Sequence, residues 1–167
     1  MASEAKSYAD LLRRSDIQSS IEKCYTILAC GVFQTKNVSN GMFEAAVVLL
    51  LINLSDLLAK AHIDGCRVDF TDHVKVTGTI KDVTDLIREC RNAACHTGSG
   101  EHKFHDVGKF KFVLVLGEDP SAMSTNGNVL GCDFKDDAAI FYGSKRVYLR
   151  RHLHNALVEV TKIYPAQ

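Results

Sequence analysis

The chain has 167 residues, the length of a single domain, and 46% of its residues are apolar while 24% are charged. This composition excludes a disordered or a fibrous protein and indicates a packed hydrophobic core. Twenty Lys and Arg residues balance twenty Asp and Glu residues, so no strong overall field draws the chain to nucleic acid or to an anionic membrane. Any contact with RNA therefore requires a local basic patch or a dimer.

The N-terminal half of the sequence predicts helices. Residues Ala2–Arg14 form a short amphipathic segment, and Ser15-Asp16 is expected to cap a second helix that begins near Ile17. A third helix is predicted from about Gly41–Ala61, and apolar residues cover most of its circumference, which is typical of a helix at the centre of a bundle. The segment 64–78 is expected to be a loop or a short extended excursion.

The apolar run of this third helix also bears on localisation. Asn53, Asp56 and Lys60 interrupt the run before the ~20 residues that a bilayer crossing needs. The first eight residues lack the basic region and the apolar region of a secretory signal. We therefore expect a cytoplasmic protein with no membrane contact, in which the six cysteines stay reduced and most of them are small core residues.

A fourth helix is predicted from Thr79 to His96, because Thr79 and Asp82 have the spacing of a capping box and the glycine-rich segment 97–100 follows. Turned at ~100° per residue, this helix has two distinct faces. Its apolar arc, which is expected to face the core, contains Val83, Leu86, Ile87, Cys90, Ala93 and Ala94. Its opposite arc carries Arg88, Glu89, Arg91, Asn92 and His96.

After residue 100 the apolar period changes from about 3.6 to 2, which predicts strands. We expect them at about 110–116, 128–134 and 138–142, in one small antiparallel sheet. The intervening stretch 119–128, rich in Pro, Ser, Asn and Gly, is expected to be an exposed loop. A final amphipathic helix is predicted within about 144–164.

Arg91, Asn92 and His96 carry the chemistry that the fourth helix can offer. A guanidinium binds phosphate oxygens and stays charged, and an imidazole titrates near neutrality, so the pair supplies the charge stabilisation and the proton transfer that metal-free RNA cleavage needs. Asn92 would orient either group or a phosphate. Because Arg91 and His96 are about 140° apart on a regular helix, either the last turn loosens or a partner chain shares the site.

The segment Arg91-Asn92-Ala93-Ala94-Cys95-His96 resembles the motif of the HEPN family, in which an arginine and an adjacent polar residue precede a histidine across a few small residues. The resemblance implies an all-helical core, a homodimer with a composite site, and in many members an endoribonuclease that needs no metal or cofactor and leaves a 2',3'-cyclic phosphate. Arg91 and His96 are then catalytic and Asn92 is supporting. Arg88 and Ser99, which flank the motif, are predicted to bind substrate.

One position departs from a subgroup of this family. Members that are paired with a nucleotidyltransferase antitoxin often have a tyrosine two positions after the histidine, where this chain has Gly98. This weakens an assignment to that kind of toxin. Some HEPN domains have lost catalysis and only bind or dimerise, but such members often lack the arginine or the histidine that this chain keeps.

Other residue patterns allow other interpretations. A zinc site built from Cys90, Cys95, His96, His102 and His105 is disfavoured because the two cysteines face different directions and no Cys-x-x-Cys pair exists. A thiol nucleophile at Cys95 is disfavoured because adjacent helical residues do not face each other. An acidic group could bind a hard cation or could simply be a solvated helix face; it consists of Asp82, Asp85 and Glu89. A basic group could contact RNA phosphates or could likewise be a solvated surface; it consists of Arg146, Arg150 and Arg151.

The sequence thus predicts one mainly α domain over 1–167, a HEPN-like helical bundle with a small antiparallel β-sheet inserted before the C-terminal helix. The helical core is expected at about 2–100 and 144–164, and the β elaboration at about 108–143. The predicted function is metal-independent RNA cleavage, toxin-like in defence or stress response, with RNA and a protein antitoxin or other protein partner. The alternative is a non-catalytic HEPN module that binds a protein, a nucleotide or RNA.

Overall fold

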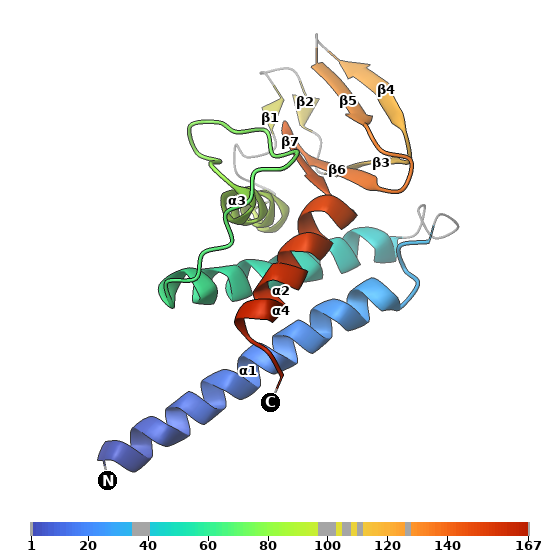
Figure 1. Cartoon of the computed structure of the whole chain (residues 1–167). Helices are drawn as coiled ribbons and strands as arrows, with labels where there is room; N and C mark the ends of the chain where they lie inside the picture. Colours follow the sequence, from blue (N-terminus) through green and yellow to red (C-terminus); the bar gives the residue numbers. More distant parts are fainter. Residues whose placement is uncertain are drawn as a thin grey trace.

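The computed structural model describes residues 2–34, 41–96, 103–104, 108–109, 112–125 and 128–166. Four α-helices form the bundle: α1 (Ala2–Ala29), α2 (Gly41–Ile63), α3 (Val83–Cys95) and α4 (Asn155–Ile163). Short antiparallel strands lie at one end of this bundle, and α4 returns from them across α2 and α1 (Figure 1). The prediction of a mainly helical chain with a small antiparallel sheet before the C-terminal helix is confirmed.

A single continuous helix, α1, replaces the two helices predicted for the N-terminal segment. Ser15 and Asp16 lie inside it, and Asp16 forms an ion pair with Lys60 of α2 at 2.5 Å instead of capping a helix. Ser and Asp favour an N-cap only where a helix starts, and the preceding residues contain no Gly or Pro that would interrupt the helix. The first half of α1 extends beyond the bundle, and residues 8–16 are exposed (Figure 1).

Helix α2 lies at the centre of the bundle, as predicted. Among the described helices it alone is long and apolar enough to cross a membrane, judged by length and composition, but 44% of its most apolar window is buried inside the protein. One face of the helix therefore packs in the core, and the opposite face is exposed. The buried residues are Phe43, Val47, Leu50, Leu51, Leu54, Leu57, Leu58 and Ala61, with Ser55 among them.

The described strands form three antiparallel sheets, where one was predicted. The central sheet has the order β3-β6-β7, and the two hairpins pair β4 with β5 and β1 with β2. The strands are β1 (Lys103–Phe104), β2 (Gly108–Lys109), β3 (Val113–Leu116), β4 (Asp119–Thr125), β5 (Asn128–Cys132), β6 (Ala138–Tyr142) and β7 (Lys145–Tyr148). The prediction that the strand at about 128–134 belongs to the same sheet as the other two is thus wrong, because β5 pairs with β4.

The stretch 119–128, predicted as a loop, contains strand β4 and the start of β5. Its side chains at 119–124 are exposed, so backbone pairing with β5 and not apolar alternation stabilises the strand. Gly131 of β5 permits a close approach of the two strands, because a Cβ atom there would lie 2.2 Å from the carbonyl oxygen of Pro120. The period-2 pattern on which strand prediction relies is absent from such a polar edge strand.

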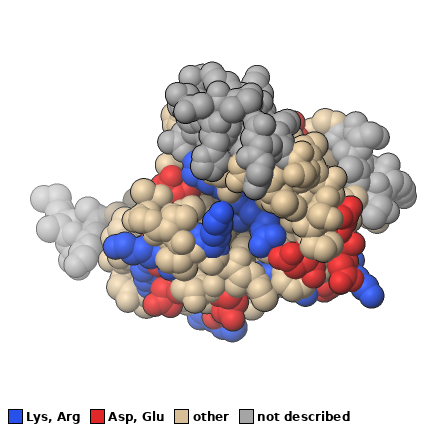
Figure 2. Space-filling model, turned by 90° about the horizontal axis from the view of Figure 1, so that it is seen from above, with Lys and Arg blue, Asp and Glu red and all other residues tan. Residues whose placement is uncertain are grey.

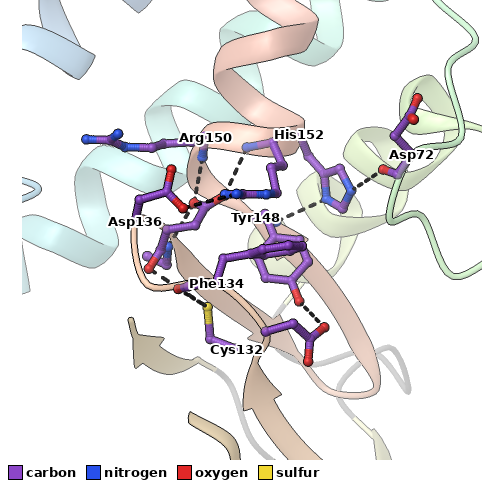
Figure 3. Close-up of polar contacts among 11 residues, drawn as sticks. Asp72, Cys132, Phe134, Asp136, Tyr148, Arg150 and His152 are labelled. Carbon is purple, nitrogen blue, oxygen red and sulfur yellow. Dashed lines mark hydrogen bonds and ion pairs between the residues drawn. The ribbon is translucent and has the colours of Figure 1, made fainter. Parts of the chain in front are cut away.

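The C-terminal helix begins later than predicted. Residues 145–148, expected to be helical, form strand β7, and the chain then enters a π-helical turn over Leu149–His154 before α4. The buried carboxylate of Asp137 organises this start, accepting hydrogen bonds from the backbone N–H groups of Arg150 at 2.8 Å and Arg151 at 3.0 Å. Figure 3 shows these contacts around Asp136, Tyr148 and Arg150.

His152 ties the segment before α3 to the C-terminal helix. Its ring is fully buried, its Nδ1 accepts a hydrogen bond from the backbone N–H of Tyr148 at 3.1 Å, and its Nε2 lies 3.1 Å from the carbonyl oxygen of Asp72 (Figure 3). Because Nδ1 is the acceptor, the proton is on Nε2, which donates to Asp72. Burial lowers the pKa of His152 to about 4.

Acidification should therefore destabilise the fold through His152, by up to about 3 kcal/mol between pH 6.5 and pH 4. The pKa of His152 in the folded state, about 4, is below the ordinary value of about 6.5. The unfolded state consequently binds more protons than the folded state in this window. The contribution of neutral His152 to the free energy of unfolding is complete above about pH 6.5 and is lost as the pH falls. Urea unfolding at a series of pH values measures the effect.

His152→Gln is the control for this prediction, since it keeps a donor near the position of Nε2 but does not titrate. It should cost stability at pH 7.5 and should flatten the pH dependence between pH 6.5 and pH 4 relative to the native chain, because all other titrating groups are shared. The same pH dependence in both proteins would show that His152 is not responsible.

Candidate functional site

The candidate motif occupies the end of α3, whose start differs from the prediction. The helix begins at Val83 and not at Thr79, and Asp82 is its N-cap, accepting a hydrogen bond from the backbone N–H of Asp85 at 2.9 Å. The acid that was predicted to close a capping box is therefore the cap itself. Asp carboxylates are among the preferred N-caps, and they also suit the positive end of the helix dipole.

Asp82 and Asp85 are buried, at 6% and 5% exposure, so the prediction of a solvated acidic face is wrong for both. Arg67, from the segment before α3, donates from Nε to Asp82 at 2.7 Å and from Nη2 to Asp85 at 2.9 Å. Burial alone would raise the pKa of Asp85, but hydrogen bonds from the Lys81 backbone and from Arg67 outweigh it and hold that pKa below its usual range. This clamp fixes the start of the helix that carries the motif.

Arg67→Ala should lower the free energy of unfolding by about 3 kcal/mol, because it leaves two buried carboxylates without their shared guanidinium. Arg67→Lys keeps the charge but loses the fork of donors, so its free energy of unfolding should lie between those of Arg67→Ala and the native chain. Urea unfolding at pH 7 measures both. A loss within about 0.5 kcal/mol of zero for Arg67→Ala would contradict the proposed role of the clamp.

The residues predicted for the site lie on the outer side of α3. Arg88 is exposed and forms ion pairs with Asp85 at 2.9 Å and with Glu89 at 3.6 Å. Arg91 and Asn92 are half-buried, and His96 is exposed at the C-cap, where its backbone N–H donates to the Asn92 carbonyl at 3.0 Å. Ser99 lies outside the described residues.

The helix is regular up to Cys95. On a regular helix the Arg91 and His96 side chains would point about 140° apart, and His96 itself follows the helix as its C-cap, with φ −107° and ψ 63°. Both residues lie at the C-terminal end of α3. A phosphate bound by both would need the last turn to move or a second copy of α3 to face the first.

The cysteines around the motif differ in environment. Cys90 is buried, and burial raises the pKa of its thiol to about 12, whereas Cys95 is exposed. Over the whole chain three cysteines are buried and three are exposed, so the prediction that most are core residues is wrong. Within the described ranges no three His, Cys, Asp or Glu side chains gather as metal ligands would, and His102 and His105 lie outside those ranges.

The basic group near the C-terminus has a structural use that the sequence did not reveal. Arg146 lies on β7, not on the helix, and pairs with Asp133 at 3.0 Å. Arg151 pairs with Asp137 at 3.1 Å and covers the ring of Phe134 at 3.5 Å. Only Arg150 of this group presents an exposed side chain without such a contact among the described residues.

A cavity of about 600 Å³ lies between the segment 66–72 and α4. Arg67 contributes to its wall, so the cavity is next to the start of α3, whereas His96 lies at the other end of a 13-residue helix, about 20 Å away. The candidate motif is thus on an open surface and not in this cavity. The position of the cavity depends on contacts between residues far apart in sequence, so no local pattern in the chain predicts it.

The surface seen from above carries a gathering of Lys and Arg side chains near its centre, next to the grey residues, while several Asp and Glu side chains lie toward one side (Figure 2). Comparison of the chain with protein-family models, with curated proteins and with solved structures finds no match. The functional interpretation consequently depends on the motif and its geometry.

Proposed function

We propose that this chain is a metal-independent endoribonuclease of the HEPN type that acts in the cytoplasm. The observation that carries the proposal is the placement of Arg91, Asn92 and His96 at the solvent-facing end of one regular helix. The other end of that helix is fixed by the clamp of Arg67 with Asp82. Functional groups held on a rigid, anchored element are what a catalytic site requires.

The reaction follows from the two titratable and charged groups. The 2'-oxygen of a ribose attacks the adjacent phosphorus while the bond from phosphorus to the 5'-oxygen breaks, which gives a 2',3'-cyclic phosphate and a 5'-hydroxyl. His96 transfers the proton that moves from the 2'-oxygen to the 5'-oxygen. Arg91 binds the non-bridging oxygens, whose negative charge grows in the transition state. Asn92 orients the phosphate, and Arg88 and Ser99 contact the flanking RNA.

A homodimer with a composite site overcomes the angle between Arg91 and His96, because Arg91 of one copy then faces His96 of the other. An exposed stripe on α2 supports a second copy: its residues follow each other at intervals of three and four, the spacing of a coiled-coil seam. Its one charged residue, Asp56, is paired with Lys60 of the same chain at 2.6 Å. The stripe consists of Met42, Ala45, Leu49, Ile52, Asp56, Ala59 and Ile63.

The first test is the incubation of a mixed RNA pool with the purified native chain in EDTA, followed by analysis of the product ends. The proposal expects cleavage that survives chelation and leaves 2',3'-cyclic phosphates. Cleavage that disappears in EDTA would contradict it. If the chain does not cleave RNA but binds RNA or a protein partner, the non-catalytic HEPN module is favoured. A toxin-like role in defence is tested separately: it predicts that expression of the chain arrests growth and that a protein antitoxin relieves the arrest.

A further inference from the structure

The segment between α2 and α3 contains a short stretch, residues 67–70, that belongs to none of the described sheets. Its side chains alternate in burial: Val68 is 5% exposed and Phe70 packs against the core, whereas Asp69 between them is exposed. A period of two in burial is the period of a β-strand. The stretch is therefore a single extended strand that lies on the core without a sheet.

One edge of this strand is used and the other is free. The carbonyl groups of Val68 and Phe70 accept hydrogen bonds from the start of α3, the first from the Thr84 hydroxyl and the second from a backbone N–H at 3.0 Å. In a strand the backbone groups of successive residues point to opposite edges. The N–H and C=O groups of Arg67 and Asp69 consequently point away from α3, and they make no hydrogen bond within the described part of the chain.

The free edge borders the cavity of about 600 Å³, whose other wall is α4. The helix lines this cavity with one stripe of side chains, at helical spacing: Asn155, Val158, Glu159, Lys162 and Ile163. From the first to the last of them the helix rises by about 12 Å, which is the length of about three to four extended residues. An extended peptide of that length fits between the strand edge and the helix.

Contacts at both ends hold the strand in place before any ligand binds. At its start the backbone N–H of Cys66 donates to the carbonyl oxygen of Ala61 at 2.9 Å. At its end the carbonyl oxygen of Asp72 lies 3.1 Å from Nε2 of the buried His152 (Figure 3). A partner that pairs with this edge therefore meets a backbone that is already ordered, which lowers the entropic cost of binding.

The charges around the cavity favour a basic ligand. The guanidinium of Arg67 is neutralised in its clamp, and Lys162 is paired with Glu159 at 2.6 Å. Asp69 and Asp72 also line the cavity, and neither forms an ion pair among the described residues. The unpaired charges on the wall are thus negative, next to the free backbone edge.

We propose that the cavity binds an extended basic segment of a partner protein, which pairs with the free backbone edge of Arg67 and Asp69. A strand added to a free edge takes its affinity from main-chain hydrogen bonds and its specificity from alternate side chains. Basic side chains of the segment lie against Asp69 and Asp72, and the apolar side chains between them contact Phe70 and Val158. The inference does not depend on the proposed ribonuclease activity.

A blocked pentapeptide in which lysine alternates with valine is the probe. Titrated into the ¹⁵N-labelled native chain, it should bind with a Kd of about 0.1 to 1 mM and shift the amide signals of Arg67 and Asp69. The same peptide with glutamate in place of lysine should bind at least about 10-fold more weakly, because like charges then face each other. Equal affinity of the two peptides, or no binding at about 5 mM, would overturn the proposal.

N-methylated peptides test the backbone pairing by itself. Methylation of the lysine nitrogens and methylation of the valine nitrogens remove donors from opposite edges of the peptide. Only one of the two patterns should reduce affinity, by at least about 10-fold, since it blocks the hydrogen bonds to the strand; the other should stay within about 2-fold. Equal effects of both patterns would mean that the peptide does not pair as a strand.

Asp69→Lys tests the site on the protein, with Asp10→Lys as the matched control. Both aspartates are exposed, but Asp10 lies on the projecting half of α1. Asp69→Lys should bind the lysine peptide about 5-fold to 10-fold more weakly, and Asp10→Lys should bind it like the native chain. Equal losses would indicate a general charge effect and overturn the site. Any RNA cleavage should be the same in Asp69→Lys as in the native chain, so peptide binding without cleavage refutes only the ribonuclease proposal.

Discussion

RNA cleavage should fall by about 10²-fold to 10³-fold in Arg91→Ala and by at least as much in His96→Ala. The first change removes the cation that stabilises the charge on phosphorus, and the second removes the group that transfers the proton. Both side chains are on the outer side of α3, so their removal should leave the fold intact. Initial rates on a fixed RNA, with Tm and oligomeric state measured for each variant, test this.

Two exposed residues of the same kinds, an arginine and a histidine away from the motif, serve as matched controls. Arg150→Ala removes an exposed arginine far along the chain from the motif, and His62→Ala removes an exposed histidine at the end of α2. Both should keep at least half of the native rate. Equal losses in the controls and in the two site variants would point to a general charge effect on RNA binding, and the site assignment would then be wrong.

The composite site makes a second, sharper expectation for the same variants. When inactive Arg91→Ala and His96→Ala chains are mixed and allowed to exchange, a mixed dimer contains one site with both substitutions and one site with neither. Activity should return to about a quarter of the native rate per dimer at random exchange. A site contained within one chain predicts no recovery, since no chain in the mixture then has both residues.

The helices that pack through a continuous apolar pattern were predictable from the sequence. α2 and α3 were found within a few residues of their ends, because Leu50, Leu54 and Leu58 of α2, and Leu86 and Cys90 of α3, repeat at helical spacing and are buried. The location of the motif on the outer side of α3 followed from the same periodicity. Fold class and candidate residues thus depended on patterns that extend over one element.

The errors came from contacts between distant segments. Arg67 and Asp82 are 15 residues apart, and only their meeting reveals why two acids at the start of α3 are buried. β4 is held by backbone pairing to β5 and not by an apolar alternation.

Asp137→Ala should lower the free energy of unfolding by about 3 to 5 kcal/mol, the largest stability loss expected for a single polar residue of this chain. The Asp137 carboxylate is completely buried, and it accepts from the backbone N–H groups of Ala138, Arg150 and Arg151 and from the Arg151 guanidinium, at 2.8 to 3.1 Å. The change leaves three backbone N–H donors, one buried and two partly buried, and one guanidinium without this acceptor. Since a domain of this size is stable by about 5 to 15 kcal/mol, the loss is a large share of the total stability, and the Tm of the variant should lie clearly below that of the native chain.

The control is Asp136→Ala, which removes the neighbouring carboxylate from the same arginine. The Asp136 side chain is 59% exposed and meets Arg151 at 3.0 Å, so its loss should cost less than about 1 kcal/mol. Hydrogen exchange should then separate the two variants by location. Because Asp137 joins β6 to the π-helical turn before α4, its loss should expose the amides of both elements to exchange together. Faster exchange in only one of the two elements would mean that the carboxylate does not couple the sheet to the helical bundle.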